Sequence, residues 1–322
     1  MFDLNQLEAA TTIVRAAIPP TPQYAWPLLG KRIGAEVWVK HENHTPTGAF
    51  KLRGGLVYLD HVVQLGDAGR GLITATRGNH GQSIPCAAAR HGVAVTVVVP
   101  NGNAVEKNAA MEAFGARLVV YGSDFDEARE EAERLGDAEG LAMVPSFDPL
   151  LVRGVATYAL EFFNAVKDLD TVYVPIGMGS GVCGLITVRD LLGLETKIVG
   201  VVSTNAPAYA LSYEAGHVVT TNSARTFADG VACRVPSPDA LEIICGGAAR
   251  IVQVSDDEVA EAMRVYHSDT HNMAEGAGAA PLAALMQERE RMQGKRVGVI
   301  LCGGNVDSAV YAAVLAGKTP SV

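Results

Sequence analysis

The chain has 322 residues, a formal net charge of -9 at pH 7, 48% hydrophobic residues and 19% charged residues. A chain of this length can bury a large core, and its composition is that of a globular protein with two domains or one large α/β unit. The acidic balance and the scattered Lys and Arg residues argue against a nucleic-acid surface, and no apolar run is long enough to cross a bilayer. We therefore expect a small-molecule partner, no membrane and, without a signal-peptide pattern at the N-terminus, a cytoplasmic location.

The chain begins with an expected amphipathic helix that Asp3 caps and that ends before the prolines near residue 20, followed by a strand at 36–40. Short β-rich runs then alternate with helical stretches, which is typical of parallel strands with helical crossovers. The strands are expected at 72–75, 93–99, 118–121, 172–176, 197–202, 251–254 and 296–301, with helices beginning near Asn79, Ala104 and Asp124.

Two sheets fit this pattern better than one. We predict an α/β fold of two domains, each an open and mostly parallel sheet flanked by helices. A small domain, residues 47–147, is inserted in a large domain made of residues 1–46 and 148–322.

Lys51 and Arg53 are expected in the first turn of a helix that Thr47 caps, where the helix dipole disfavours cations. Two cations at this position indicate a nearby anion or a lysine that burial keeps neutral. The alternative is a solvated lysine at a helix start.

Three further strand-to-helix junctions are rich in glycine and small polar residues. In open α/β sheets, ligands bind at the carboxyl ends of strands, so we expect these junctions and the Lys51 junction to converge on one crevice. The junction at 74–82 offers the free N–H groups of a helix start to a carboxylate or another anion. There Asn79 could instead cap the helix, and His80 could be a core histidine.

The junction at 175–184 is dense in glycine, which lets the backbone approach a phosphate. Gly179, Gly181 and Gly184 also fit the G-x-G-x-x-G pattern of NAD-binding proteins, but residues 199–205 lack the acid that should bind the ribose. The glycine pattern makes an NAD-dependent oxidoreductase the rival class, and the missing acid counts against it. A loop that only packs a helix on its sheet is the structural alternative.

The last junction, at 301–307, contains Cys302, which could face the crevice or be an inert core cysteine. Glu275 supplies a carboxylate at a helix start, where the alternative is capping and compensation of the helix dipole. The five cysteines are far apart and show no zinc spacing, so neither disulfides nor a structural metal are indicated.

A lysine of perturbed charge, a phosphate loop and no metal site suggest a Schiff base to a phosphorylated aldehyde cofactor. The sequence resembles the fold-type II pyridoxal-phosphate enzymes, close to the serine/threonine dehydratases and serine racemases, over essentially its whole length. The motifs that carry the resemblance are Phe50-Lys51-Leu52-Arg53-Gly54, Arg77-Gly78-Asn79-His80, Gly177-Met178-Gly179-Ser180-Gly181 and Cys302-Gly303-Gly304-Asn305.

The resemblance implies that Lys51 forms the Schiff base with pyridoxal 5'-phosphate and later removes the substrate α-proton. It also implies a set of cofactor-binding residues: Phe50 on the ring, Asn79 at the 3-hydroxyl, Gly177, Met178, Gly179, Ser180 and Gly181 at the phosphate, and Cys302 beside the pyridine nitrogen. We add Glu275 to this set. Thr76, Arg77, Gly78, Asn79 and His80 are expected to meet the substrate carboxylate.

Two departures from the family narrow the function. Serine racemases have a second acid/base serine where this chain has Arg77, and an arginine stays charged, so racemase activity is disfavoured. Residues 202–208 contain none of the acids with which racemase-like relatives bind a divalent cation, so we predict no metal there.

We predict a dehydratase (ammonia-lyase) that converts a β-hydroxy-L-amino acid, such as threonine, serine, phenylserine or hydroxyaspartate, to a 2-oxo acid and ammonia. A cysteine-synthase-like β-replacement enzyme is the alternative within the same chemistry. A homodimer is expected.

Overall fold

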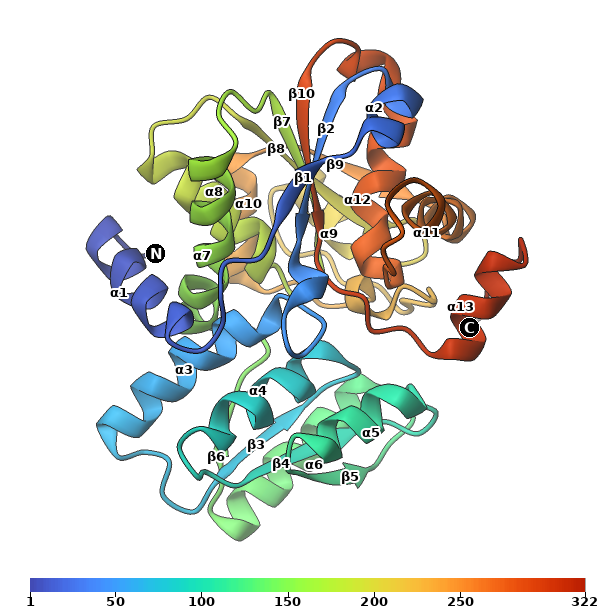
Figure 1. The fold of residues 1–322 in the computed structure, drawn as a ribbon. Coiled ribbons are helices and arrows are strands. Elements are labelled where there is room, and N and C mark those ends of the chain that lie inside the picture. Colours follow the sequence, from blue (N-terminus) through green and yellow to red (C-terminus); the bar gives the residue numbers. More distant parts are fainter. Residues whose placement is uncertain (322) are drawn as a thin grey trace.

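The strands form two sheets in the computed structural model, which describes residues 1–321 (Figure 1). The larger sheet has the order β1-β2-β10-β7-β8-β9, in which only β1 and β2 pair antiparallel. The smaller sheet has the order β5-β4-β3-β6 and is entirely parallel. These sheets confirm the predicted α/β fold with mostly parallel strands. The strands are β1 (Gln23–Ala25), β2 (Glu36–His41), β3 (Leu72–Ala75), β4 (Val95–Val99), β5 (Ala116–Val120), β6 (Ala142–Met143), β7 (Thr171–Pro175), β8 (Lys197–Ser203), β9 (Ala248–Val254) and β10 (Arg296–Leu301).

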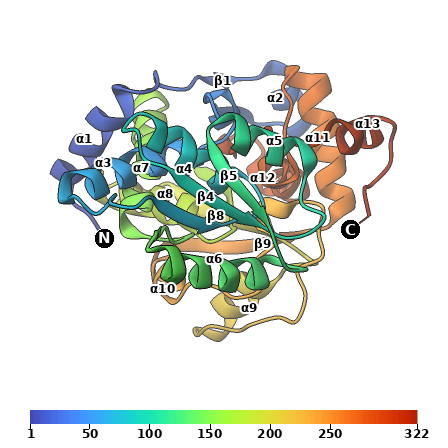
Figure 2. The ribbon, with the colours of Figure 1, turned by 90° about the horizontal axis from the view of Figure 1, so that it is seen from below.

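Helices cover both faces of each sheet. The α-helices are α1 (Leu4–Arg15), α2 (Pro27–Ile33), α3 (Lys51–Leu65), α4 (Asn79–Ala89), α5 (Val105–Ala113), α6 (Phe125–Glu139), α7 (Pro149–Ala165), α8 (Ser180–Leu191), α9 (Ala208–Ala215), α10 (Pro238–Gly247), α11 (Asp256–Thr270), α12 (Gly276–Gln287) and α13 (Ser308–Leu315), and the short 3-10 helices are η1 (Glu42–His44), η2 (Asp229–Val231) and η3 (Arg289–Met292). On the larger sheet, α7, α8 and α10 cover one face and α2, α11 and α12 the other (Figure 1). On the smaller sheet, α6 lies opposite α4 and α5 (Figure 2). None of the helices in residues 1–321 is long and apolar enough to span a membrane.

Of the two helix caps predicted from the sequence, at Asp3 and at Thr47, one is correct and one is wrong. The Asp3 carboxylate accepts a hydrogen bond from the Gln6 N–H at 2.8 Å and caps α1, as expected. Thr47 does not cap the Lys51 helix, since α3 begins at Lys51 directly after Phe50 and the Thr47 hydroxyl donates to the Ala49 carbonyl at 3.3 Å. Gly48, with a φ of 66°, turns the chain between Thr47 and the helix, which removes the hydroxyl from the helix start.

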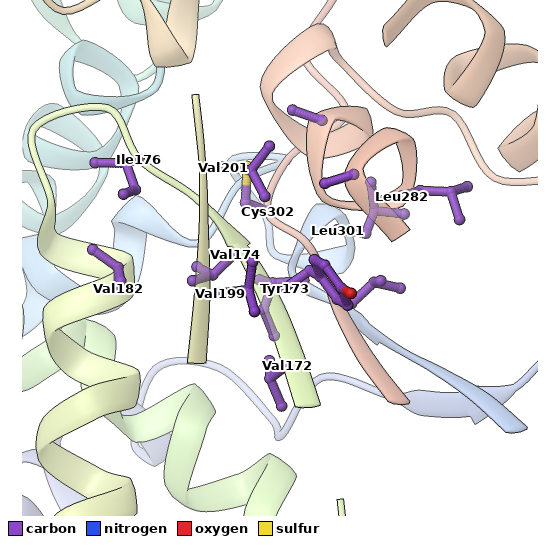
Figure 3. Close-up of a cluster of buried hydrophobic side chains, with 14 of the residues drawn as sticks. Val172, Tyr173, Val174, Ile176, Val182, Val199, Val201, Leu282, Leu301 and Cys302 are labelled. Carbon is purple, nitrogen blue, oxygen red and sulfur yellow. The ribbon is translucent and has the colours of Figure 1, made fainter. Parts of the chain in front are cut away.

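The main hydrophobic core lies between the larger sheet and its helices. Valines of β7 and β8 pack against Val182 of α8 and Leu282 of α12, and Cys302 lies at the end of this cluster, directly after β10 (Figure 3). The smaller sheet lies wholly within residues 47–147. Ala10 and Val14 of α1 nevertheless pack in the same core as α3 and α4, and the division into two domains stays a prediction.

Candidate active site

The order of strands brings three of the four junctions together. β10 lies between β2 and β7, with Leu301 paired with His41 and Val299 with Tyr173. The segments that leave the carboxyl ends of these strands therefore start side by side. Together with the loop between β3 and α4 of the smaller sheet, they enclose one cavity. Every predicted site residue lines this cavity, namely Phe50, Lys51, Thr76, Arg77, Gly78, Asn79, His80, Gly177, Met178, Gly179, Ser180, Gly181, Glu275 and Cys302.

Lys51 is the first residue of α3 and places its amine inside the cavity. The Lys51 Nζ donates a hydrogen bond to the Ser180 Oγ at 3.1 Å, which joins the Lys51 junction to the glycine junction. Burial lowers the pKa of Lys51 to about 8. The Lys51 amine therefore loses its proton more readily than the amine of a solvated lysine, whose pKa is about 10.4.

Arg53 is fully buried, and nearby anions neutralise it, which was the first explanation for a cation at this helix start. Its Nε lies 2.7 Å from Glu42 Oε2, and its Nη2 lies 2.8 Å from Glu161 Oε2. Lys40 shares Glu161, with its Nζ at 2.8 Å. Burial lowers the pKa of Arg53, but the charge of Glu42 and the hydrogen bonds and charge of Glu161 outweigh it and raise that pKa overall. The start of α3 is thus tied by ion pairs to the end of β2 and to α7.

The glycine turn at 177–181 leads into α8, whose first N–H groups have no partners within the helix. Gly179 has a φ of 102°, which favours glycine. The hydroxyls of Tyr209 and Tyr158 donate to the carbonyls of Met178 and Gly181 at 3.0 and 3.1 Å and hold the turn. This arrangement suits an anion.

Gly184 instead matches the structural alternative, in which a glycine of this junction only allows close helix packing. A Cβ at Gly184 would lie 3.2 Å from the Ala156 Cα, so this glycine lets α8 approach α7.

The polar side of the cavity is a chain of hydrogen bonds centred on Glu275. The Asn79 amide donates to Glu275 Oε1 at 2.6 Å, and the Asn305 amide donates to Asn79 Oδ1 at 2.8 Å. Lys107 forms an ion pair with Asp229 and lies 3.5 Å from Glu275 Oε2. Burial raises the pKa of Glu275 to about 7, although the charge of Lys107 opposes it.

The capping alternatives for Asn79 and Glu275 are wrong. The helix α4 begins at Asn79 itself, after Gly78, and Glu275 makes no side-chain cap on α12. Both side chains point their polar atoms at other residues of the cavity. Sequence reasoning missed Lys107 and Asp229, because a lysine within an expected helix and an aspartate in a loop carry no local signal.

His80 and Cys302 are both buried and neutral. Burial and the charge of Lys51 lower the pKa of His80 to about 3. Burial and the charge of Glu275 raise the pKa of the Cys302 thiol well above its usual value. The Cys302 carbonyl accepts from the Phe50 N–H at 2.9 Å, which fixes β10 beside the residue that precedes Lys51.

Comparisons with known proteins agree with this geometry. A family model described as "Pyridoxal-phosphate dependent enzyme" matches residues 14–303. An L-threonine ammonia-lyase of Thermotoga maritima is 30% identical over 95% of this chain and 76% of that relative. An L-threo-3-hydroxyaspartate ammonia-lyase of Saccharomyces cerevisiae is 30% identical over 96% of this chain and 95% of that relative.

A solved structure of threonine deaminase isoform 2 from Solanum lycopersicum has a TM-score of 0.88 at 28% identity and covers 98% of this chain and 95% of its own. The family match also decides between pyridoxal phosphate and the NAD alternative. The chain belongs to the pyridoxal-phosphate dependent enzymes.

Proposed function

We propose that this chain is a hydroxy-amino-acid dehydratase that releases ammonia and a 2-oxo acid from a β-hydroxy-L-amino acid. The observation that carries the proposal is the contact between the Lys51 amine and Ser180, 3.1 Å long, inside the cavity. It places a lysine of lowered pKa next to a glycine turn that suits a phosphate. The relatives named as threonine and 3-hydroxyaspartate ammonia-lyases support this reaction.

The residues present fit pyridoxal phosphate. An amine whose pKa burial lowers to about 8 suits attack on an aldehyde, and the start of α8 suits a phosphate. Under this proposal Lys51 would hold the aldehyde carbon, residues 177–181 the phosphate, and Asn79 the 3-hydroxyl. Phe50 would pack on the ring, and Glu275 would act through Asn79, to which it is hydrogen-bonded. When bound, the cofactor supplies an electron sink for the substrate α-carbon.

The protein's own residues would do the remaining work. The Lys51 amine would take the α-proton, and its lowered pKa, which keeps part of the amine unprotonated, supports this role. The start of α4 would bind the substrate carboxylate through its free N–H groups. The α-C–H and β-C–O bonds break with loss of water, and a second water then releases ammonia. The Cys302 thiol keeps its proton and presents a neutral group at its end of the cavity.

The test compares wild type with Lys51→Ala after both are incubated with pyridoxal phosphate. We expect a visible absorbance band that borohydride fixes onto Lys51 in wild type alone, and ammonia release from β-hydroxy amino acids in wild type alone. Colour that borohydride does not fix onto Lys51 would overturn the role of this residue. Turnover only with an added thiol would favour the β-replacement alternative.

A homodimer, a cytoplasmic location and the lack of a nucleic-acid partner belong to the same proposal. The acidic net charge of -9 supports the last of these. Light scattering of the purified protein tests the dimer.

A further inference from the structure

Arg77 is a cation at the cavity that has no counter-charge among residues 1–321. It lies in the loop between β3 and α4 and lines both the cavity and a larger outer groove formed by residues 123–147 and 222–238. Its Nε is buried without a hydrogen-bond partner, and its guanidinium forms no ion pair with residues 1–321. Leaving a buried charged donor unsatisfied is unfavourable, so the position favours an anionic ligand.

The neighbouring acids are already engaged. Inside the cavity, Asp229 and Glu275 face Lys107. In the outer groove, Arg234 pairs with Asp124 at 3.2 Å and with Asp126 at 3.5 Å. No ion pair within residues 1–321 is therefore left for Arg77 to brace its own loop.

The substrate α-carboxylate does not need this guanidinium. The start of α4, directly after Arg77 and Gly78, offers neutral backbone N–H groups for it. A substrate with only that carboxylate would leave Arg77 unpaired. A second carboxylate, attached to the β-carbon, would give this guanidinium the counter-charge that it lacks among residues 1–321.

We propose that Arg77 recognises a carboxylate on the β-carbon of the substrate, so that the preferred substrate class is the 3-hydroxyaspartate type. This inference rests on the proposed dehydratase function. A planar guanidinium can hold a carboxylate with two parallel hydrogen bonds, a geometry that lysine cannot reproduce.

The test measures kcat/KM for ammonia release from L-threo-3-hydroxyaspartate, L-threonine and L-threo-phenylserine by the holoenzyme. Wild type should prefer hydroxyaspartate. Arg77→Gln should lower kcat/KM for hydroxyaspartate by about 10- to 100-fold and leave kcat/KM for threonine within about threefold of wild type. Arg77→Lys should recover only part of the loss for hydroxyaspartate. Arg225→Gln is the matched control, because Arg225 is an exposed cation that lines the outer groove alone. Arg225→Gln should change kcat/KM for neither hydroxyaspartate nor threonine.

Three results would overturn the inference. An equal loss for hydroxyaspartate and threonine in Arg77→Gln would place the guanidinium at the α-carboxylate. A loss confined to phenylserine would assign it to an aromatic group. A wild type that prefers threonine over hydroxyaspartate would also contradict it.

A binding measurement separates this inference from the proposed function. L-aspartate carries the β-carboxylate but no β-hydroxyl, whereas L-alanine lacks both. Calorimetric titration of the wild-type holoenzyme should give tighter binding of L-aspartate, and Arg77→Gln should remove that preference. If wild type releases no ammonia but keeps the preference, the dehydratase proposal fails and the role of Arg77 stands; equal binding of both ligands by wild type overturns the role of Arg77.

Discussion

The ion-pair cluster behind Lys51 should make one buried carboxylate unusually important for stability. Glu161 accepts from Arg53 Nη1 at 3.0 Å, from Arg53 Nη2 at 2.8 Å and from Lys40 Nζ at 2.8 Å. With Glu42, the cluster holds two positive and two negative charges away from water. Glu161→Gln leaves one uncompensated positive charge there, so we expect the free energy of unfolding to fall by about 3–5 kcal/mol.

A double variant distinguishes lost charge balance from lost packing. Lys40→Met with Glu161→Gln restores neutrality, and this protein should be more stable than Glu161→Gln alone by about 1–3 kcal/mol. Urea unfolding of the apoprotein, followed by the fluorescence of Trp26 and Trp38, which lie in or beside β2, measures both values. Glu261→Gln is the control, because it breaks a half-exposed pair with Arg264 and should cost less than about 1 kcal/mol. A loss in Glu161→Gln no larger than in this control would refute the reasoning.

Three further predictions concern the cavity. Burial lowers the pKa of Lys51 to about 8, so the rate of pyridoxal phosphate uptake by the apoprotein should rise about tenfold per pH unit and level off near pH 8. Absorbance measures this rate at each pH. A rate that still rises between pH 8 and pH 10 would contradict the prediction. Gly179→Ala should weaken cofactor binding at least about tenfold by fluorescence titration, because its φ is 102° and its Cβ would lie 2.7 Å from the Ala240 Cβ; Gly193→Ala, at φ 63° in open space, should bind normally. Burial raises the pKa of Glu275 from 4.5 to about 7, so the stability that its protonation gives the folded apoprotein is present below pH 4.5 and lost as the pH rises to about 7. Glu275→Gln should reduce the fall in the free energy of unfolding across that range, and an unchanged slope would count against a buried, titrating Glu275.

Local patterns predicted the junctions of the cavity but not the order of the strands that brings them together. Glycine-rich turns after apolar runs marked the loops at 76 and 177, and the predicted start of α4 at Asn79 is correct. That β10 lies between β2 and β7 follows from packing among segments more than a hundred residues apart, which no local signal records. Lys107 and Asp229 were missed for the same reason. The Thr47 cap was wrong because the turn at Gly48 depends on tertiary contacts.

Lys51 and Arg53 show how one helix turn can hold an amine of lowered pKa beside a permanent charge. Arg53 cannot lose its proton, and it is buried only because Glu42 and Glu161 neutralise it. Lys51 faces the cavity, where its direct partner is the uncharged Ser180 hydroxyl, so burial acts on its pKa with little compensation. Lys51 and Arg53 are two residues apart, so their side chains point to different sides of the helix. Had the carboxylates lain on the cavity side, their charges would raise the pKa of Lys51 and leave much less of the neutral amine to attack an aldehyde. The placement of Glu42 and Glu161 behind the helix therefore favours the proposed chemistry.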